Sequence, residues 1–221
     1  MFWQKFKLAI ASLAITLAAE MQAQNLPVKY LALGDSYTIG ESVLEKDRWP
    51  NQLAIFLSTN KKEVKSSIIA TTGWRTDNLM NAITIASLKN DYDLVSLLIG
   101  VNNQYQGKAV DQYATEFEEL LKTSIRLAKG NKENVFVVSI PDYGFTPFGQ
   151  KNQSKISKEI DQFNEVNKKI TNQYRIKYFT ITDISREAIS DPSLVAADGL
   201  HPSGKMYTRW AQRIAKEITL K

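Results

Sequence analysis

The most constraining feature of this chain is the alternation of short strand-like runs with longer helical patterns. Five runs are rich in β-branched, aliphatic or aromatic residues: Val28–Leu33, Val64–Ile69, Leu94–Ile99, Val135–Ile140 and Tyr178–Ile184. Apolar residues at helical spacing fill the intervening and final segments, at Trp49–Leu57, Arg75–Leu88, Asp111–Lys129, Ile156–Tyr174 and Ser203–Leu220. This alternation predicts an α/β domain whose parallel sheet of about five strands carries helices on both faces.

The N-terminal segment has the composition of a secretory signal peptide. Met1–Lys7 carries two lysines and no acid, Leu8–Ala19 is uncharged and mostly apolar, and a small residue, Ala23, follows. The apolar run is shorter than the roughly 20 residues that a membrane-spanning helix needs. We therefore predict a signal peptide over residues 1–23, a single domain over 24–221, and a secreted or periplasmic protein that is not stably inserted in a membrane after cleavage. An uncleaved N-terminal anchor is the alternative.

The composition excludes several kinds of site. The chain has no cysteine, which rules out disulfides, thiol nucleophiles and thiolate metal sites. Its single histidine, His201, rules out a multi-histidine zinc site within one chain. The net charge of +5 is spread over predicted helices, and no basic cluster is interleaved with stacking aromatics. The residues from 34 to 40 lack the spacing of a nucleotide phosphate cradle. We expect no cofactor, no metal and no nucleic-acid partner.

The residues that follow the predicted strands are unusually polar and glycine-rich. In open α/β sheets, ligands bind at the loops beyond the carboxyl ends of the strands. The first four strands run into loops at residues 34–36, 71–74, 100–104 and 141–144, and the last strand leads toward His201. All of the distinctive residues therefore fall on one edge of the predicted sheet, where we expect the functional site.

A serine and the only histidine stand out on this edge. Ser36 lies in the Gly34-Asp35-Ser36 turn after the first strand, and Asp198 precedes His201 by three positions. A serine hydroxyl is a weak nucleophile at neutral pH and needs an adjacent base, whose tautomer a carboxylate fixes. The pattern predicts nucleophilic acyl chemistry, with Ser36 as nucleophile, His201 as base and Asp198 as the acid that orients it. Each also has a structural alternative, as a turn or cap residue.

These segments resemble the SGNH subgroup of the GDSL-type esterase/lipase family. Its blocks occur in order over nearly the whole mature chain, as Gly34-Asp35-Ser36, Gly73, Gly100-x-Asn102 and Asp198-x-x-His201-Pro202. The resemblance implies a three-layer, flavodoxin-like fold and the same triad of Ser36, His201 and Asp198. It also implies an oxyanion hole formed by the backbone N–H groups of Ser36 and Gly73 with the side-chain amide of Asn102.

Two positions depart from the family pattern. Tyr37 stands where the family name has leucine, a position that varies widely. Asn103 stands where members often have aspartate, which puts the supporting hydrogen bonds in question more than the chemistry. Aromatic residues on the same edge are candidates for lining an acyl or sugar pocket: Trp74, Tyr105, Tyr143, Phe145 and Phe148. The alternative is that these side chains pack against their own loops.

The sequence therefore predicts a secreted serine hydrolase that cleaves carboxylic esters through an acyl-serine intermediate. Short-chain acyl or O-acetyl esters, on small molecules or glycans, are the favoured substrates. An acyltransferase that uses the same serine is the nearest alternative. A second alternative is a non-catalytic glycan-binding domain of the same fold. The natural substrate, the oligomeric state and the final location are not determined by the sequence.

Overall fold

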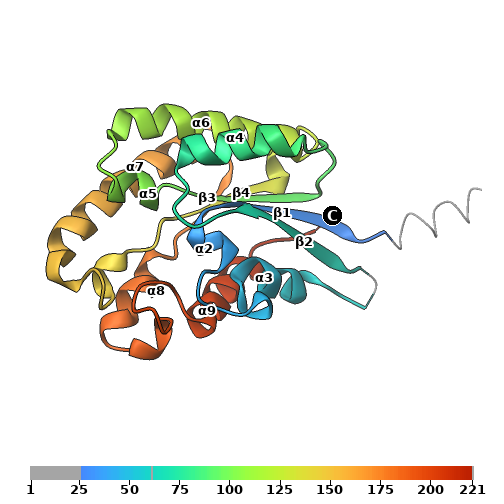
Figure 1. Ribbon diagram of the computed structural model, residues 1–221. Helices are drawn as coiled ribbons and strands as arrows, with labels where there is room; N and C mark the ends of the chain where they lie inside the picture. The colour runs from blue at the N-terminus through green and yellow to red at the C-terminus, as the bar shows by residue number, and fades with distance from the viewer. Residues whose placement is uncertain (1–25, 61, 221) are drawn as a thin grey trace, which may run out of the picture.

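The computed structural model describes residues 26–60 and 62–220 of the chain (Figure 1). The predicted signal peptide, residues 1–23, lies outside the described residues, as does its predicted cleavage site. Within the described part, no helix is both long enough and apolar enough to cross a membrane.

A five-stranded sheet forms the centre of the molecule. The strands are β1 (Val28–Gly34), β2 (Val64–Ala70), β3 (Leu94–Leu98), β4 (Val135–Val138) and β5 (Lys177–Phe179). Every neighbouring pair is parallel, and the spatial order is β2-β1-β3-β4-β5. This is the flavodoxin-like order, whose topological switch point lies between β1 and β3. The predicted α/β class and the parallel five-stranded sheet are confirmed.

Helices cover both faces of the sheet, giving three layers (Figure 1). On one face lie α4 (Thr76–Ala86), α6 (Val110–Leu127) and α7 (Gln153–Gln173), and on the other lie α3 (Trp49–Leu57) and α9 (Gly204–Ala215). Short helices follow the carboxyl ends of three strands: α2 (Ser36–Ile39), α5 (Val101–Tyr105) and α8 (Thr182–Arg186). Single 3₁₀ turns lie at Glu45–Asp47, Lys132–Asn134, Tyr143–Phe145, Gln150–Asn152, Glu187–Ile189 and Pro192–Leu194.

The core explains the nearly uninterrupted apolar strands. Every residue of β3 and β4 is buried, as expected where helices cover both faces of a parallel sheet. Trp49 from α3 and Trp210 from α9 are completely buried on one face. The polar Ser96 in β3 is buried as well, but its hydroxyl forms a hydrogen bond of 2.8 Å with the hydroxyl of Tyr30. This hydrogen bond offsets the cost of burying the two hydroxyls in the core.

The fifth strand and the last helix are shorter than predicted. The β-branched run Tyr178–Ile184 predicts strand, but β5 ends at Phe179 and residues 182–184 belong to α8. Tertiary hydrogen bonds override the propensity, because the backbone N–H of Ile181 donates to Ser139 Oγ (2.8 Å) and turns the chain out of the sheet. The short helices α2, α5 and α8 were not predicted, since four or five residues carry little periodicity.

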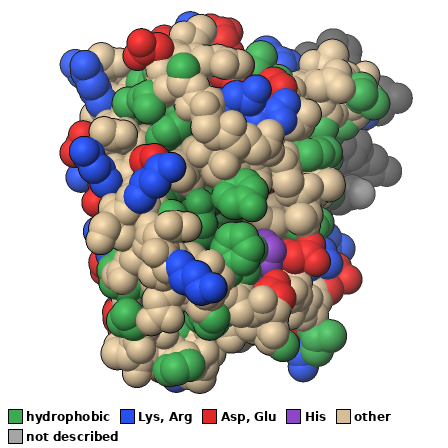
Figure 2. All heavy atoms as spheres, turned by 60° about the vertical axis from the view of Figure 1, so that its left-hand side comes forward, with side chains coloured by type: hydrophobic (Ala, Val, Ile, Leu, Met, Phe, Trp, Pro, Cys, Tyr) green, Lys and Arg blue, Asp and Glu red, His purple; other side chains and the backbone are tan. Residues whose placement is uncertain are grey.

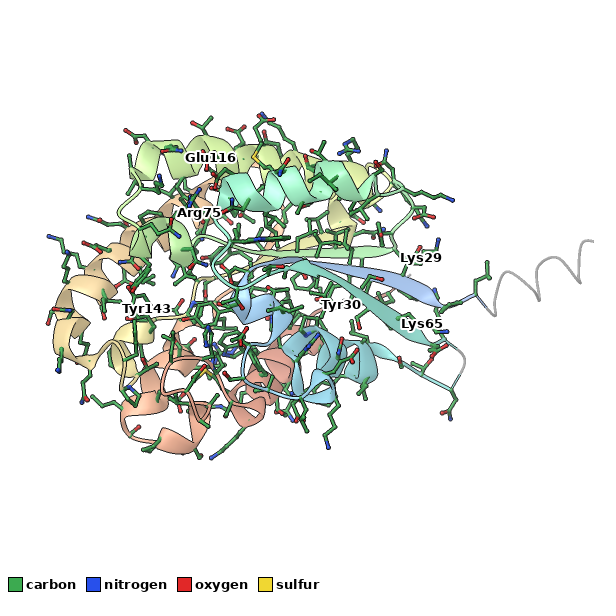
Figure 3. All side chains as sticks on the ribbon, viewed as in Figure 1. Lys29, Tyr30, Lys65, Arg75, Glu116 and Tyr143 are labelled. Carbon is green, nitrogen blue, oxygen red and sulfur yellow. The ribbon has the colours of Figure 1, made fainter. Side chains whose placement is uncertain are left out.

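The register of the sheet brings three loops together at one edge. Gly34, the last residue of β1, lies opposite Ala70 of β2 and Leu98 of β3. Figure 3 shows the two ends of the molecule, with Arg75 and Tyr143 toward the carboxyl ends of the strands and Lys29 and Lys65 at the amino ends. A cavity of about 1000 Å³ lies at the amino ends, where Val28, Leu94 and Val135 contribute to its lining. It is therefore remote from the edge predicted to carry the chemistry.

Candidate active site

A tight turn at the end of β1 positions Ser36. A Cβ at Gly34 would lie 2.1 Å from Thr38 Oγ1 and 2.5 Å from the Leu98 carbonyl oxygen, so only glycine fits there. Asp35 is the N-cap of α2, and its Oδ1 accepts a hydrogen bond of 3.0 Å from the backbone N–H of Tyr37. Ser36 is therefore the first residue of a helix and is itself buried.

Asp35 lies in a fully buried environment. Its Oδ2 has no hydrogen-bond partner within the described part of the chain. Burial raises the pKa of the Asp35 carboxyl to about 7, against the opposing effect of the Tyr37 backbone N–H. This aspartate therefore caps the helix that begins at Ser36, and its charge is disfavoured.

Asp198 and His201 form a hydrogen-bonded pair. His201 Nδ1 lies 2.7 Å from Asp198 Oδ2. Asp198 Oδ1 accepts the backbone N–H groups of Leu200 (2.9 Å) and His201 (3.0 Å). Partial burial would raise the pKa of Asp198, but hydrogen bonds from Ser42 and His201 together with those backbone amides hold it well below its usual range. The carboxylate is ionised at neutral pH. With the Nδ1 proton donated to it, the lone pair of Nε2 is left for a reacting proton.

The loop that carries His201 is fixed at both ends. The backbone N–H of Ala196 donates to the His201 carbonyl (2.7 Å), and that of Ser203 donates to Leu194 (2.8 Å). Ser203 also caps α9 through its hydroxyl, which accepts from the N–H of Met206 at 3.3 Å. The imidazole is thus held just before the helix, in the loop position that Pro202 predicts.

The imidazole lies beside the turn that carries Ser36, the predicted nucleophile. Its ring contacts that of Tyr37 edge-on, with the centroids 5.7 Å apart. Tyr37 is the immediate neighbour of Ser36. In the described part of the chain, no direct hydrogen bond joins Ser36 to His201. Serine–histidine contacts are commonly long without substrate and shorten when it binds.

The predicted oxyanion-hole residues come from the two neighbouring loops. Gly73 has a φ of +83°, and a Cβ there would meet nothing within 4 Å. The left-handed backbone therefore favours glycine here, whereas the space around it would admit a larger side chain. Asn102 lies in α5, and its Nδ2 donates to the Trp74 carbonyl at 3.0 Å. One amide hydrogen thus fixes the side chain to the loop that contains Gly73.

Asn103 forms hydrogen bonds to the residue at which α4 begins, just after the same loop. It is buried, and its Oδ1 accepts the backbone N–H of Thr76 (3.1 Å) while its Nδ2 donates to Thr76 Oγ1 (2.7 Å). The residue that departs from the family pattern therefore makes two hydrogen bonds to the start of α4. A carboxylate at this position has no hydrogen to give to Thr76 Oγ1.

The aromatic candidates differ in exposure. Tyr105 and Phe148 are 60% and 53% exposed, while Tyr143 is buried and donates its hydroxyl to Gln104 Oε1 at 3.0 Å. The rings of Tyr105, Tyr143 and Phe148 contact one another pairwise, with each centroid separation 6.2 Å. Trp74 is half-buried and packs against the core. We call Tyr105, Tyr143 and Phe148 the aromatic cluster.

The aromatic cluster is connected to the histidine loop. The backbone N–H of Phe148 donates to the Gly199 carbonyl at 3.0 Å, two residues before His201. Figure 2 shows hydrophobic side chains gathered immediately beside the single histidine on the surface. The rings of Tyr105 and Phe148 are exposed to solvent on this side of the molecule, which we call the open face.

Two contacts at the site were missed by sequence reasoning. Ser42 Oγ donates to Asp198 Oδ2 at 2.6 Å, and the Glu41 carboxylate accepts from the Thr72 hydroxyl. Neither residue belongs to a recognisable motif, and the first contact joins positions 156 residues apart. Only the left-handed Gly40 that ends α2 signals that the chain turns back here.

Residues 32–209 match the model of the GDSL-like Lipase/Acylhydrolase family, which covers most of the chain and all of the blocks described above. The chain belongs to this family. It is accordingly an SGNH hydrolase and a carboxylic ester hydrolase. The sequence matches none of the curated proteins with which it was compared.

Solved structures of GDSL-family proteins share the fold. A member of the lipolytic protein G-D-S-L family from Veillonella parvula superposes with a TM-score of 0.68, at 18% identity over 86% of this chain and 98% of that one. Axe2, an acetylxylan esterase from Geobacillus stearothermophilus, also gives 0.68, at 18% identity over 89% and 97%. Est24, a carbohydrate acetylesterase from Sinorhizobium meliloti, gives 0.60, at 18% identity over 86% and 97%.

Proposed function

We propose that this GDSL-family hydrolase is an exported esterase that removes short acyl groups, O-acetyl groups on glycans above all, through an acyl-Ser36 intermediate. The observation that carries the chemistry is the Asp198–His201 pair, 2.7 Å apart, held beside the turn that begins α2 at Ser36. No other histidine exists in the chain to serve as the base.

In the proposed reaction, Ser36 Oγ attacks the ester carbonyl carbon and its proton passes to His201 Nε2. The tetrahedral intermediate collapses as the bond to the alcohol oxygen breaks, and His201 returns the proton to that oxygen. Water then attacks the acyl-serine, with His201 again taking the proton, and the carboxylic acid leaves as Ser36 is restored. Ionised Asp198 stabilises the imidazolium that forms in each half-reaction.

The carbonyl oxygen carries negative charge in both tetrahedral intermediates. The proposed donors are the backbone N–H groups of Ser36 and Gly73 and the second amide hydrogen of Asn102. Each preorganised donor of this type is worth about 10²–10³ in rate. Asn102 is suited to the task because its first amide hydrogen is already fixed on the Trp74 carbonyl, so its orientation is set before substrate arrives.

Two observations support a short acyl group on a glycan as the substrate. The exposed rings of Tyr105 and Phe148 offer flat apolar faces of the kind that pack against sugar rings. Two structural neighbours, Axe2 and Est24, are an acetylxylan esterase and a carbohydrate acetylesterase.

A series of p-nitrophenyl esters from acetate to long chains tests the proposal, with Ser36→Ala and His201→Ala assayed beside the wild type. We expect the highest kcat/KM for acetate and a loss of several orders of magnitude in both variants. Measuring acetate release from acetylated xylan then tests whether the enzyme acts on O-acetyl groups of a glycan. Turnover that survives Ser36→Ala would contradict the assignment of Ser36 as the nucleophile. A preference for long chains would contradict the proposal that the substrate carries a short acyl group.

Two further measurements address the acyltransferase alternative and export. Product analysis with added alcohol or sugar acceptors distinguishes hydrolysis from transfer, since transfer yields a new ester in place of free acid. Expression of the full chain with a secretion system, followed by N-terminal sequencing, tests the leader. We expect the mature protein to begin at Gln24, and retention of Met1 in the exported protein would contradict cleavage.

A further inference from the structure

The segment Gly40–Ser42, which follows α2, contacts the parts of the candidate site that come from other loops. The backbone N–H groups of Gly40 and Glu41 both donate to the Ser36 carbonyl, at 3.0 and 3.1 Å. The Glu41 carboxylate accepts a hydrogen bond from the hydroxyl of Thr72, the residue before the oxyanion-hole glycine. The segment is therefore tied to the nucleophile on one side and to the second loop on the other.

Ser42 extends this network to the catalytic acid. Its Oγ donates to Asp198 Oδ2 at 2.6 Å, on the same oxygen that accepts His201 Nδ1 at 2.7 Å. The other carboxylate oxygen, Oδ1, is occupied by two backbone N–H groups of its own loop. Ser42 is thus the donor to Asp198 that comes from the nucleophile loop.

The exposure of Asp198 gives this bond its importance. The Asp198 side chain is 30% exposed, whereas that of His201 is 10% exposed. The two backbone N–H groups hold Oδ1, but water competes for the lone pairs of Oδ2, the oxygen that faces His201. The Ser42 hydroxyl occupies one of those lone pairs with a charge-assisted hydrogen bond and so restricts the position of Oδ2.

The backbone at Ser42 is an independent sign that its side chain matters. Its φ is +64°, in the left-handed region that costs free energy for any residue with a Cβ. Glycine would take this conformation without that cost. Strained residues persist where the surrounding structure fixes them, and they concentrate at functional sites.

We propose that Ser42 is a positioning residue that acts through Asp198: its hydroxyl fixes the carboxylate, and through it the imidazole, relative to the Ser36 turn. The inference rests on the proposed function and adds a fourth residue to the proposed triad of Ser36, His201 and Asp198. Ser42 orients Asp198, and Asp198 in turn orients His201 toward Ser36. Ser42 transfers no proton to substrate in this scheme.

The first test replaces Ser42 by glycine and by alanine. Both variants lose the hydroxyl, but Ser42→Gly relaxes the backbone while Ser42→Ala keeps it strained. We expect kcat on p-nitrophenyl acetate to fall about 10-fold in both, the loss of one charge-assisted hydrogen bond, with KM unchanged. Ser87→Gly is the matched control, since Ser87 is also left-handed (φ +47°) and lies at the exposed end of α4. A fall in Ser42→Ala alone would assign the effect to the backbone and overturn the proposal.

A double-mutant cycle with Asp198→Ala tests the route of the effect. If Ser42 acts through Asp198, then Ser42→Gly changes kcat no further in the Asp198→Ala background. An equal fall in both backgrounds would show that Ser42 acts by another path, which also overturns the proposal.

A third readout does not depend on turnover. Because His201 is the only histidine, its Nδ1–H proton gives a single imidazole signal in the NMR spectrum. We expect Ser42→Gly to shift this resonance and to speed its exchange with water, and Ser87→Gly to leave it in place. If the wild type hydrolyses no ester, the proposed function fails and this signal alone decides the role of Ser42. An unchanged signal in Ser42→Gly overturns it.

Discussion

The two aspartates in the family blocks occupy opposite environments at the same edge of the sheet. Asp35, in the nucleophile turn, is completely buried, and burial raises its pKa to about 7. Asp198, before the histidine, is 30% exposed at its side chain, and its four hydrogen bonds hold its pKa below the usual range. Identical side chains thus differ in pKa, since burial outweighs the Tyr37 N–H at Asp35, whereas four hydrogen bonds outweigh partial burial at Asp198.

The largest effect expected from this contrast is on turnover. Asp198→Asn should lower kcat by about 10⁴, because the amide favours the wrong tautomer of His201. Asp35→Asn should lower kcat only a few-fold, since asparagine is an equally good N-cap and its amide oxygen still accepts from the Tyr37 backbone N–H. Steady-state kinetics on p-nitrophenyl acetate compare the two. Equal losses would mean that Asp35 takes part in the chemistry as well.

The pH dependence of stability should have opposite signs at the two sites. Asp35 has a raised folded-state pKa, so its contribution is complete below an unfolded pKa of about 4 and is lost as pH rises through about 7. Asp198 has a lowered pKa, so its contribution is present above about 4 and is lost as pH falls.

Urea denaturation at a series of pH values measures the contributions of both aspartates to the free energy of unfolding. We expect Asp35→Asn to remove a decline of about 4 kcal/mol between about pH 4 and about pH 8. Asp198→Asn should instead remove a decline on the acid side. If Asp35→Asn leaves the slope of the free energy of unfolding between about pH 4 and about pH 7 as it is in the wild type, the buried, proton-binding Asp35 is contradicted.

Asn103→Asp places a third carboxylate in this comparison. The site is buried and offers one donor, the Thr76 backbone N–H, while the Thr76 hydroxyl already donates to Glu116. The new acid should therefore behave as Asp35 does and destabilise the protein by about 1–3 kcal/mol at neutral pH, less under acid conditions. Thermal denaturation at two pH values checks this. A stabilised variant would show that the loop rearranges to supply donors.

The smallest effect is expected on the open side of the site. Phe148→Ala removes an exposed ring from the aromatic cluster, so KM for acetylated xylan should rise about 2–10-fold. The p-nitrophenyl acetate KM should stay unchanged, because that substrate carries no sugar. Ile85→Ala, a change at an exposed apolar residue on α4, serves as the control. A similar rise with both substrates would place Phe148 against the acyl group.

The sequence was informative wherever the pattern was local. Strand–helix alternation predicted the parallel sheet, and the bounds of α3 were predicted as observed, at Trp49–Leu57. The fifth strand was overextended, because Thr182 and Ile184 have strand propensity while hydrogen bonds to Ser139 and Ile140 direct that segment into a helix. Such contacts between distant segments are not visible in a local pattern.

The same limit applies to the candidate site. Its motif residues fall on the predicted edge because parallel strands end together. The electrostatic difference between Asp35 and Asp198 was not predictable, since both lie beside glycine in polar turns. Burial and the number of donors decide it, and these arise from loops that meet only in the folded chain. Ser42 was missed for the same reason.

The two ends of the described chain lie together at the amino ends of the strands, on the side opposite His201. Leu26 and Leu220 line the same cavity there, and Figure 1 shows the C-terminus beside the start of β1. The seven residues of β1 span about 20 Å between that end and the Ser36 turn. A bead, a surface or a carrier domain coupled through either end would therefore leave the open face pointing outward.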